Sequence, residues 1–282
     1  MLIAQITDIH LGFEPDNPEE ANRQRLDRVL SELIGGRNRP ELMLATGDLV
    51  DRGDLDSYRR VAEALRQCPF PVYPCMGNHD DRANFASVFP QVPIVSGFVQ
   101  YCIALEGLRI IILDTLEVGR HGGGFCEIRA AWLKARLAEH RDTPTMIVMH
   151  HPPLDTGIDW MDPRPDQPWI GRFTAAISGH RQIQAIWCGH LHRTIVAPWN
   201  GITVSVCPAT AAELSLDLNP IDPDQPDDRP MVNNDPPGYA LHRWTRHGMV
   251  SHFDAVQEHV VLAKFDDRMQ GLVRELLEER RH

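Results

Sequence analysis

LIAQITDIH, residues 2–10, places a short and mostly apolar run directly before an aspartate and a histidine. Residues 2–6 predict a buried strand, because the run is apolar and of strand length. Asp8 and His10 are two residues apart, and in extended backbone such a pair points to one side. The stretch therefore predicts a strand that carries two potential ligands at its C-terminal end.

The same arrangement recurs four times further along the chain. Each of four more predicted strands, residues 42–45, 72–75, 146–149 and 183–188, is followed directly by a polar motif. These motifs are Gly47-Asp48, Gly77-Asn78-His79-Asp80, His150-His151 and Gly189-His190-Leu191-His192. In α/β sheets, ligands bind beyond the C-terminal ends of the strands. Five polar groups at that edge predict one functional site.

The first two hundred residues alternate strand patterns with helical patterns, which is typical of a layered α/β domain. Amphipathic helices are expected at residues 21–34, 55–67 and 129–140, and a hairpin is expected at 98–105 and 109–113. The prediction for residues 195–206 is a further pair of strands. The first 210 residues are therefore interpreted as one catalytic core.

Residues 211–282 are interpreted as a C-terminal extension, either part of the same domain or an oligomerisation element. Prolines and aspartates crowd residues 218–237, which predicts an irregular cap loop without strand or helix. Residues 238–244 and 249–254 predict a closing hairpin. Residues 265–277 predict an amphipathic helix that packs on the body or on a second subunit.

Charge and composition exclude several classes of function. The chain has 282 residues with 28 Lys plus Arg against 39 Asp plus Glu, a net charge of −11. Such a field repels phosphate backbones, so no nucleic-acid polymer is expected as a partner. The six cysteines are scattered without a C-x-x-C pair, which favours a reducing compartment. Because no apolar run approaches the ~18 residues that span a bilayer, we expect a cytoplasmic protein and no membrane partner.

The donor types in the five motifs indicate a metal centre. They comprise two aspartates, one amide and four imidazoles without a thiolate, which suits Zn, Mn, Fe or Co better than Ca, Mg or Cu(I). The donors are too many for one tetrahedral ion, and a carboxylate bridging two divalent ions about 3.5–4 Å apart explains the surplus. Asp48 is the natural bridge. Asp8, His10 and one histidine of the G-H-x-H motif then bind one ion, while Asn78, His150 and the other histidine bind the second.

D-x-H, G-D, G-N-H-D, H-H-P-P and G-H-x-H, in this order between residues 8 and 192, resemble the motifs of the calcineurin-like metallophosphoesterase superfamily. The resemblance is closest to the bacterial class III cyclic-nucleotide and glycerophosphodiester phosphodiesterases. It implies a four-layer αββα sandwich, a dinuclear site and a homo-oligomer, a dimer or larger. By position it implies this ligand set: Asp8, His10, Asp48 and His192 on the first metal, and Asp48, Asn78, His150 and His190 on the second. His79 becomes the non-ligand histidine beside the leaving group.

The expected function is hydrolysis of small phosphodiesters, either 3′,5′-cyclic nucleotides or glycerophosphodiesters. A hydroxide that bridges two cations is a nucleophile at neutral pH. His79 then acts as a general acid or holds a phosphoryl oxygen, and Asp80 orients its ring. Asn78, His79 and Arg52 are candidate substrate contacts. The alternatives are a phosphomonoesterase or nucleotide pyrophosphohydrolase on the same scaffold, and a metal-bound scaffold that no longer catalyses.

Residues beside these motifs have two interpretations each. His151 should point away from its neighbour His150, and it either supports the site from behind or has a structural role. Asp114 either hydrogen-bonds a ligand histidine or caps a strand end. Trp160, Trp169 and Phe173 either line a pocket for a base or aryl group or close a loop onto the core.

Overall fold

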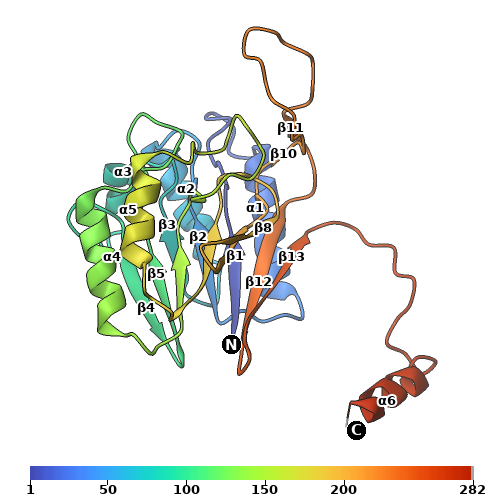
Figure 1. Cartoon of the computed structure of the whole chain (residues 1–282). Helices are drawn as coiled ribbons and strands as arrows, with labels where there is room; N and C mark the ends of the chain where they lie inside the picture. The colour runs from blue at the N-terminus through green and yellow to red at the C-terminus, as the bar shows by residue number, and fades with distance from the viewer. Residues whose placement is uncertain (281–282) are drawn as a thin grey trace.

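A computed structural model describes residues 1–280 and contains two stacked sheets (Figure 1). In the first sheet, β1 (Leu2–Ile6), β2 (Leu42–Thr46) and β3 (Val72–Cys75) are parallel neighbours. The C-terminal hairpin of β12 (Gly238–Thr245) and β13 (Gly248–Ala255) completes this sheet, because β12 pairs antiparallel with β1. The strand order is β13-β12-β1-β2-β3, so β1 lies in the middle.

The second sheet has six strands in the order β4-β5-β6-β7-β9-β8. Its parallel centre is built from β5 (Leu108–Ile112), β6 (Thr145–Val148), β7 (Ile183–Cys188) and β9 (Ile202–Val206). Its edges, β4 (Tyr101–Leu105) and β8 (Ile195–Trp199), pair antiparallel with their neighbours. The predicted hairpin around Glu106-Gly107 is therefore confirmed as β4–β5.

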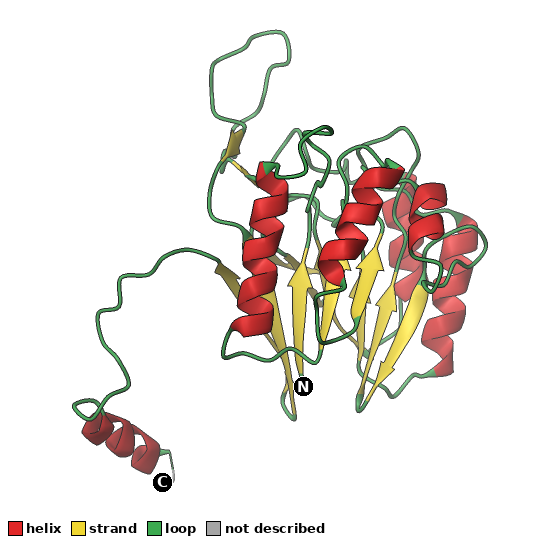
Figure 2. Cartoon of the chain, turned by 180° about the vertical axis from the view of Figure 1, so that it is seen from behind, coloured by secondary structure: helices red, strands yellow, loops and turns green. Residues whose placement is uncertain are grey.

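Strand periodicity explains why helices cover both outer faces. In β6, Met146 and Val148 pack between the two sheets, while Ile147 belongs to the outer cluster. Successive side chains of a strand point to opposite faces, so a strand buried on both faces is apolar throughout. The outer cluster is covered by α4 (Glu127–Glu139) and α5 (Pro168–Ile177). The first sheet is covered by α1 (Ala21–Gly35), α2 (Leu55–Leu65) and α3 (Arg82–Val88), which confirms the four-layer αββα sandwich (Figure 2).

A buried polar network joins the two sheets. The Gln5 side-chain amide donates to the Thr46 hydroxyl at 2.9 Å and to the Cys188 carbonyl at 3.1 Å. His242 Nε2 donates to Gln5 Oε1 at 2.9 Å, and the His242 ring stacks on Trp187 with centroids 3.9 Å apart. Gln5 and His242 belong to the first sheet, whereas Trp187 and Cys188 belong to the second. Because these buried polar groups need hydrogen-bond partners, the bonds between them fix the position of one sheet on the other.

Two helices and two short strands of the structure were not predicted from the sequence. The helices α3 and α5 were not predicted. Trp169 and Phe173 lie in α5 and are buried in the outer cluster, so the core interpretation is right for Phe173, while Trp169 also borders a hollow of the surface. The segment expected to contain no strand includes β11 (Val232–Asn233), which pairs with β10 (Glu213–Leu214) at the base of a projecting loop (Figure 1).

The C-terminal helix is shorter than predicted and stands apart from the body. It spans Gln270–Glu279 (α6) rather than residues 265–277, and none of its residues is buried. Figure 1 shows α6 at the end of a long extended segment. Packing on the body of the same chain is therefore wrong, and the apolar side chains of this segment stay exposed, Leu262 by 94% and Phe265 by 76%. Among the described residues, no helix combines the length and the apolarity that crossing a membrane requires.

Candidate metal centre

The polar motifs that follow the strands meet at one edge of the two sheets. Backbone hydrogen bonds tie their loops together, for example from Asp8 N to the Gly47 carbonyl and from Gly189 N to the His150 carbonyl. Eight non-glycine residues with positive φ are found in the described chain, and five of these are candidate ligands: Asp8, His10, Asp48, His190 and His192. Such conformations are costly and concentrate at functional sites. The strained loops therefore coincide with the predicted site.

One group of donors consists of Asp8, His10 and His192. His192 Nδ1 donates to the Ala212 carbonyl at 2.7 Å, and His10 Nδ1 donates to Asp51 Oδ1 at 3.2 Å. Each Nε2 is therefore left with a lone pair, and the two Nε2 atoms face each other at 3.2 Å. Asp8 Oδ1 lies 3.4 Å from His192 Nε2. These two nitrogen atoms and the carboxylate oxygen carry lone pairs with no proton between them, so together they can coordinate a cation.

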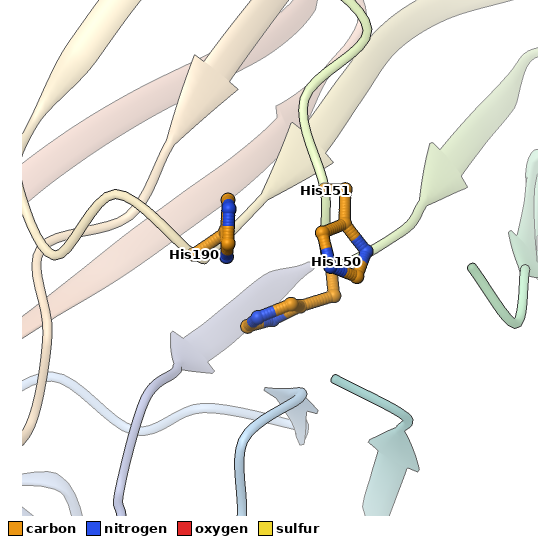
Figure 3. A group of neighbouring side chains, drawn as sticks. All are labelled: His150, His151 and His190. Atoms are coloured by element: carbon orange, nitrogen blue, oxygen red, sulfur yellow. The ribbon is translucent and has the colours of Figure 1, made fainter. Parts of the chain in front are cut away.

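A second group contains His150 and His190, and Asn78 follows Gly77 in the turn that packs against Asp48. His150 Nδ1 donates to the Thr46 carbonyl at 2.8 Å, while its buried Nε2 has no hydrogen-bond partner. The buried Oδ1 of Asn78 also lacks a partner. The rings of His150 and His190 are 5.3 Å apart, and Figure 3 shows these imidazoles gathered with His151 from two chain segments. Buried polar atoms without partners are rare, and a bound ion is a common reason for them.

Asp48 lies between the two groups. Its Oδ2 is 3.6 Å from His10 Nε2 and 3.2 Å from His150 Nε2. Its Oδ1 accepts a hydrogen bond from the His79 backbone N–H at 2.8 Å. Burial alone would raise the pKa of Asp48, but the imidazoles of His150, His10 and His79, in their protonated forms, lower it well below its usual value. Asp48 is therefore an ionised carboxylate within reach of both groups.

His190 provides a neutral imidazole. Burial lowers the pKa of His190 well below its ordinary value, and the neighbouring His151 and His150 lower it further. A neutral ring keeps the lone pair that a metal ion requires. Its backbone N–H donates to the Asp8 carboxylate at 3.0 Å, which couples the two groups.

His79 lies at the open side of the cluster. Its Nδ1 donates to the Asp51 carbonyl at 2.7 Å, so Nε2 remains free, and its ring packs edge-on against His10 with centroids 4.6 Å apart. The side chain is 30% exposed, whereas that of His150 is fully buried. His79 is therefore more exposed than His192 and His10, whose side chains are 16% and 10% exposed.

His151 lies behind the cluster, as predicted. Its Nε2 donates to the His121 carbonyl at 3.0 Å, and its Nδ1 accepts from the Thr115 hydroxyl at 2.8 Å. Both ring nitrogens are thus engaged, and no lone pair is left for a metal ion. His151 still packs on His190 with centroids 4.6 Å apart and so holds that ring in place.

The residue that orients a candidate ligand is Asp51, which the sequence analysis did not identify in this role. Of the two interpretations of Asp114, the hydrogen bond to a ligand histidine is not found. Asp114 instead forms two bonds of 2.7 Å to Arg82 and accepts from the Val99 and Leu116 N–H groups, which makes it the strand-end clamp of the alternative interpretation. The signal for Asp51 was its position three residues after Asp48, at the mouth of the same loop.

Asp80 is buried in the turn beside the cluster, and Arg52 lies at the rim of the cluster. Asp80 does not orient the His79 ring, because its oxygens accept from the Gly77 N–H at 2.8 Å and the Tyr58 hydroxyl at 2.9 Å. It fixes the turn that carries Asn78 and His79. The Arg52 side chain is 60% exposed and lies 3.5 Å from Asp51, so it is placed at the rim of the cluster.

Glycine is necessary at position 77 because the backbone of this turn lies very close to Asp48. A Cβ at Gly77 would lie 2.2 Å from Asp48 Oδ1 and 2.4 Å from Asp48 N. Any larger residue would push the β3–α3 turn away from Asp48. The G-N-H-D motif therefore needs its glycine for contact with the G-D motif.

The residues present fit divalent metal ions. Imidazoles, carboxylates and an amide present lone pairs at this edge, and no proton lies between them to form hydrogen bonds. The Nδ1 atoms of His192 and His150 donate to backbone carbonyls, and Nδ1 of His10 donates to the Asp51 carboxylate. Such outer hydrogen bonds are the usual support for histidine ligands. Mixed nitrogen and oxygen donors suit Zn, Mn, Fe or Co.

Comparisons with known proteins agree with this site. The model of the calcineurin-like phosphoesterase family matches residues 1–194. A probable cyclic nucleotide phosphodiesterase of Rhodopseudomonas palustris is 36% identical over 205 residues, which cover 69% of this chain and 72% of the relative. A probable glycerophosphodiester phosphodiesterase of Arcobacter nitrofigilis is 28% identical over 258 residues, covering 89% and 92% of the two chains.

A solved structure shows the same fold. The crystal structure of a dimetal phosphatase from Danio rerio superposes with a TM-score of 0.65 at 16% identity, covering 92% of this chain and 97% of the other. The matched family residues include every candidate ligand from Asp8 to His192. The family uses divalent metal ions, and the clusters described above can bind them. The chain therefore belongs to the calcineurin-like phosphoesterase family and is a hydrolase of phosphate esters.

Proposed function

We propose that the protein is a dinuclear metal-dependent phosphodiesterase that hydrolyses small phosphodiesters. The observation that carries the proposal is the position of Asp48, whose Oδ2 lies 3.6 Å from His10 Nε2 on one side and 3.2 Å from His150 Nε2 on the other. A carboxylate that lies between two groups of lone-pair donors is in a position to bridge two metal ions, which supports the proposal.

The proposed ligand set follows from the two groups. Asp8, His10, Asp48 and His192 hold the first ion, and Asp48, Asn78, His150 and His190 hold the second. The free lone pairs of His10, His192 and His150 support this division. Mn, Fe, Zn and Co are the candidate ions. When bound, two such ions supply Lewis-acid charge and acidify a water molecule.

Residues of the chain itself position the ester and manage the leaving group. His79 presents its free Nε2 to the reacting phosphate, because Nδ1 is held by the Asp51 carbonyl. In its protonated form, Nε2–H donates to the departing alkoxide or to a phosphoryl oxygen. Asn78 and, at the rim, Arg52 are the other proposed substrate contacts.

The proposed substrates are 3′,5′-cyclic nucleotides or glycerophosphodiesters. Two of the similar proteins are named as phosphodiesterases for these two kinds of substrate, which supports the proposal. A phosphomonoesterase or nucleotide pyrophosphohydrolase and a catalytically silent scaffold remain as outcomes of the test below.

The test is hydrolysis by the purified protein supplied with Mn, Zn, Fe or Co. The panel contains cyclic AMP, glycerophosphoethanolamine, bis-(p-nitrophenyl) phosphate and p-nitrophenyl phosphate. We expect the diesters to react faster than the monoester and a chelator to stop the reaction. A clear preference for the monoester would replace diesterase by monoesterase, and bound metal without any turnover would favour the scaffold.

The site itself is tested with a pair of matched substitutions. Asp48→Asn removes the proposed bridging charge, and we expect it to lose metal and turnover. Asp56→Asn makes the same change at a residue whose side chain is 84% exposed on α2, and it should behave as wild type. Full activity and two bound ions in Asp48→Asn would refute the proposed bridge.

A further inference from the structure

A small hollow adjoins the metal centre on the side of His190. It has a volume of ≈ 190 Å³ and is lined by His190 and His151, by His121, and by Trp160, Met161 and Trp169. Trp160 is 42% exposed, although it is a large apolar side chain. The metal centre and this aromatic hollow therefore share a wall, and a substituent of a phosphate held at the centre can enter it.

The charge of the hollow is unusual for a site beside a phosphate. Apart from its histidines, Asp162 is the one ionisable side chain among its described lining residues, and no arginine or lysine lines it. A larger cavity next to it is lined by Arg120, Arg129, Arg164 and Arg172. The hollow therefore disfavours anions, whereas the neighbouring cavity is rich in arginine.

Asp162 is held rigidly by its own loop. Its Oδ2 accepts from the Thr156 N–H at 2.8 Å and the Gly157 N–H at 2.7 Å, and its Oδ1 accepts from the Thr156 hydroxyl at 2.6 Å. These bonds occupy three of the about four acceptor sites of a carboxylate, and burial together with a hydrogen bond to Asp155 raises the pKa of Asp162. The carboxylate is thus fixed in position before a ligand arrives.

We propose that this hollow is a subsite for a small cationic substituent of the substrate, such as the ammonioethyl or trimethylammonioethyl group of a phosphodiester. The inference rests on the proposed phosphodiesterase function and names the chemistry of the alcohol that the enzyme selects. Indole rings attract ammonium groups through their π-electron faces, most strongly when the cation is desolvated. Asp162 adds the opposite charge.

The size of the hollow agrees with one substituent rather than a whole nucleotide. Sites for complete small molecules measure roughly 300–1,000 Å³. A nucleobase could also stack on tryptophan and donate a neutral hydrogen bond to Asp162, but only a cation also gains the attraction of opposite charges. The combination of indole and carboxylate therefore favours the cation.

The first experiment measures binding without turnover. Tryptophan fluorescence is titrated with choline, with its neutral analogue 3,3-dimethylbutan-1-ol and with adenosine, at constant ionic strength. We expect choline to bind about tenfold more tightly than the neutral analogue. Equal affinity for choline and the neutral analogue, or tighter binding of adenosine, would overturn the proposal.

Substitutions locate the binding. Trp160→Leu and Asp162→Asn should each weaken choline binding, whereas Trp160→Phe should restore part of it because an aromatic face remains. Asp159→Asn changes an exposed carboxylate of the same loop and should leave choline binding unchanged. Melting curves identify any variant whose loop fails to fold. Wild-type choline affinity in a folded Trp160→Leu protein would refute the assignment of the subsite.

The second experiment separates this proposal from the proposed function. With glycerophosphocholine as substrate, Trp160→Leu should raise KM about tenfold with little change in kcat, because the lost contact exists in both ground state and transition state. If choline binds but no diester is hydrolysed, the subsite stands and the phosphodiesterase proposal fails. If diesters are hydrolysed with no preference for cationic alcohols, the subsite fails and the phosphodiesterase proposal stands.

Discussion

Asp51 shows how a residue outside the ligand set controls a ligand. Its carboxylate holds His10 Nδ1 at 3.2 Å, and its carbonyl holds His79 Nδ1 at 2.7 Å. The same residue therefore fixes which nitrogen of each ring carries the proton and which is free. His10 offers its Nε2 lone pair to the centre, and His79 offers Nε2 to the substrate side.

We predict that Asp51→Asn weakens metal binding by about 10–100-fold, because outer hydrogen bonds of this kind set ligand basicity and ring orientation. The measurement is a metal titration of the chelated protein. Asp56→Asn is the control at an exposed position. Unchanged metal affinity in Asp51→Asn would show that His10 needs no such support.

We predict that His79→Ala lowers kcat by about 10²–10⁴-fold for esters with poor leaving groups, which is the usual contribution of a general acid. Esters of p-nitrophenol, whose leaving group needs little protonation, should lose much less. Metal content should stay at the wild-type level, since His79 is not a proposed ligand. Equal losses for both kinds of ester would assign His79 to phosphoryl binding instead of proton donation.

At this scale, residue types and spacing predicted which side chains the fold brings together, but they did not predict the contacts that support these side chains. The candidate ligands all follow strands, so strand ends bring them together. Asp51, Asp80 and Asp114 have similar local contexts, yet they support a ligand, a turn and a strand end, respectively. Which partner each carboxylate meets depends on loops from distant parts of the chain.

At the scale of elements, the β3–α3 turn depends on Gly77. We predict that Gly77→Ala reduces both stability and metal content, because the added Cβ would lie 2.2 Å from Asp48 Oδ1. A clash with backbone at a site without free space costs about 1–3 kcal/mol. Thermal unfolding and metal analysis measure the two effects.

Gly171→Ala is the matched control for this turn. Gly171 lies inside α5, and a Cβ there would meet nothing within 4 Å. Alanine favours the helix by about 0.5–1 kcal/mol over glycine, so this variant should melt slightly higher. A Gly77→Ala protein with wild-type stability and metal content would show that the turn can move.

Elements with a clear period were predicted, and elements without one were missed. The α5 helix begins at Pro168 after a stretch rich in proline and aspartate, and that composition favoured a loop. Proline is well tolerated in the first turn of a helix, so it marks a start here. The α3 helix has only seven residues, too few to show a period.

At the scale of the whole molecule, the network of Gln5 and His242 makes stability depend on pH. Burial lowers the pKa of His242 to about 3 from an ordinary value of 6.5, with a smaller effect of the His252 charge. Between these two values the unfolded chain binds a proton at this residue and the folded chain does not. The free energy of unfolding therefore falls as pH falls from 6.5 to about 3, by up to ~1.4 kcal/mol per pH unit.

Urea unfolding of wild type and His242→Gln between pH 7 and pH 4 measures this contribution. We expect the variant to be less stable at pH 7 and to lose less stability on acidification than wild type. His140→Gln, at an exposed residue after α4, should keep the wild-type slope. Parallel slopes for wild type and His242→Gln would place the acid sensitivity elsewhere.

The detached C-terminal segment leads to a prediction about assembly. Val260, Leu262 and Phe265 are 87%, 94% and 76% exposed, and α6 buries none of its residues. We propose that this segment packs on a second copy of the chain. Removing residues from 257 onward should leave melting temperature and diester hydrolysis nearly unchanged while converting an oligomer to a monomer in light scattering. The same oligomer after the removal would assign the contact to another surface.

The sequence predicted the strands of both sheets but not their order. Apolar runs mark residues 2–6 and 238–244 as strands, yet nothing local indicates that they are neighbours, because the pairing of β1 with β12 spans most of the chain. The four-layer stacking followed from the family resemblance. Long-range pairing is fixed by shape and by buried groups such as Gln5 and His242, which no short window of sequence reveals.

The position of β1 has a consequence for how the protein is made. At the ribosome, residues 2–6 emerge more than two hundred residues before their partner strand β12, a delay on the order of ten seconds or more. During that time β1 has β2 on one side and an open, apolar edge on the other, a template for aggregation. Folding of the nascent chain is therefore incomplete until translation has passed residue 245, and chains that stop short of β12 are natural clients for chaperones.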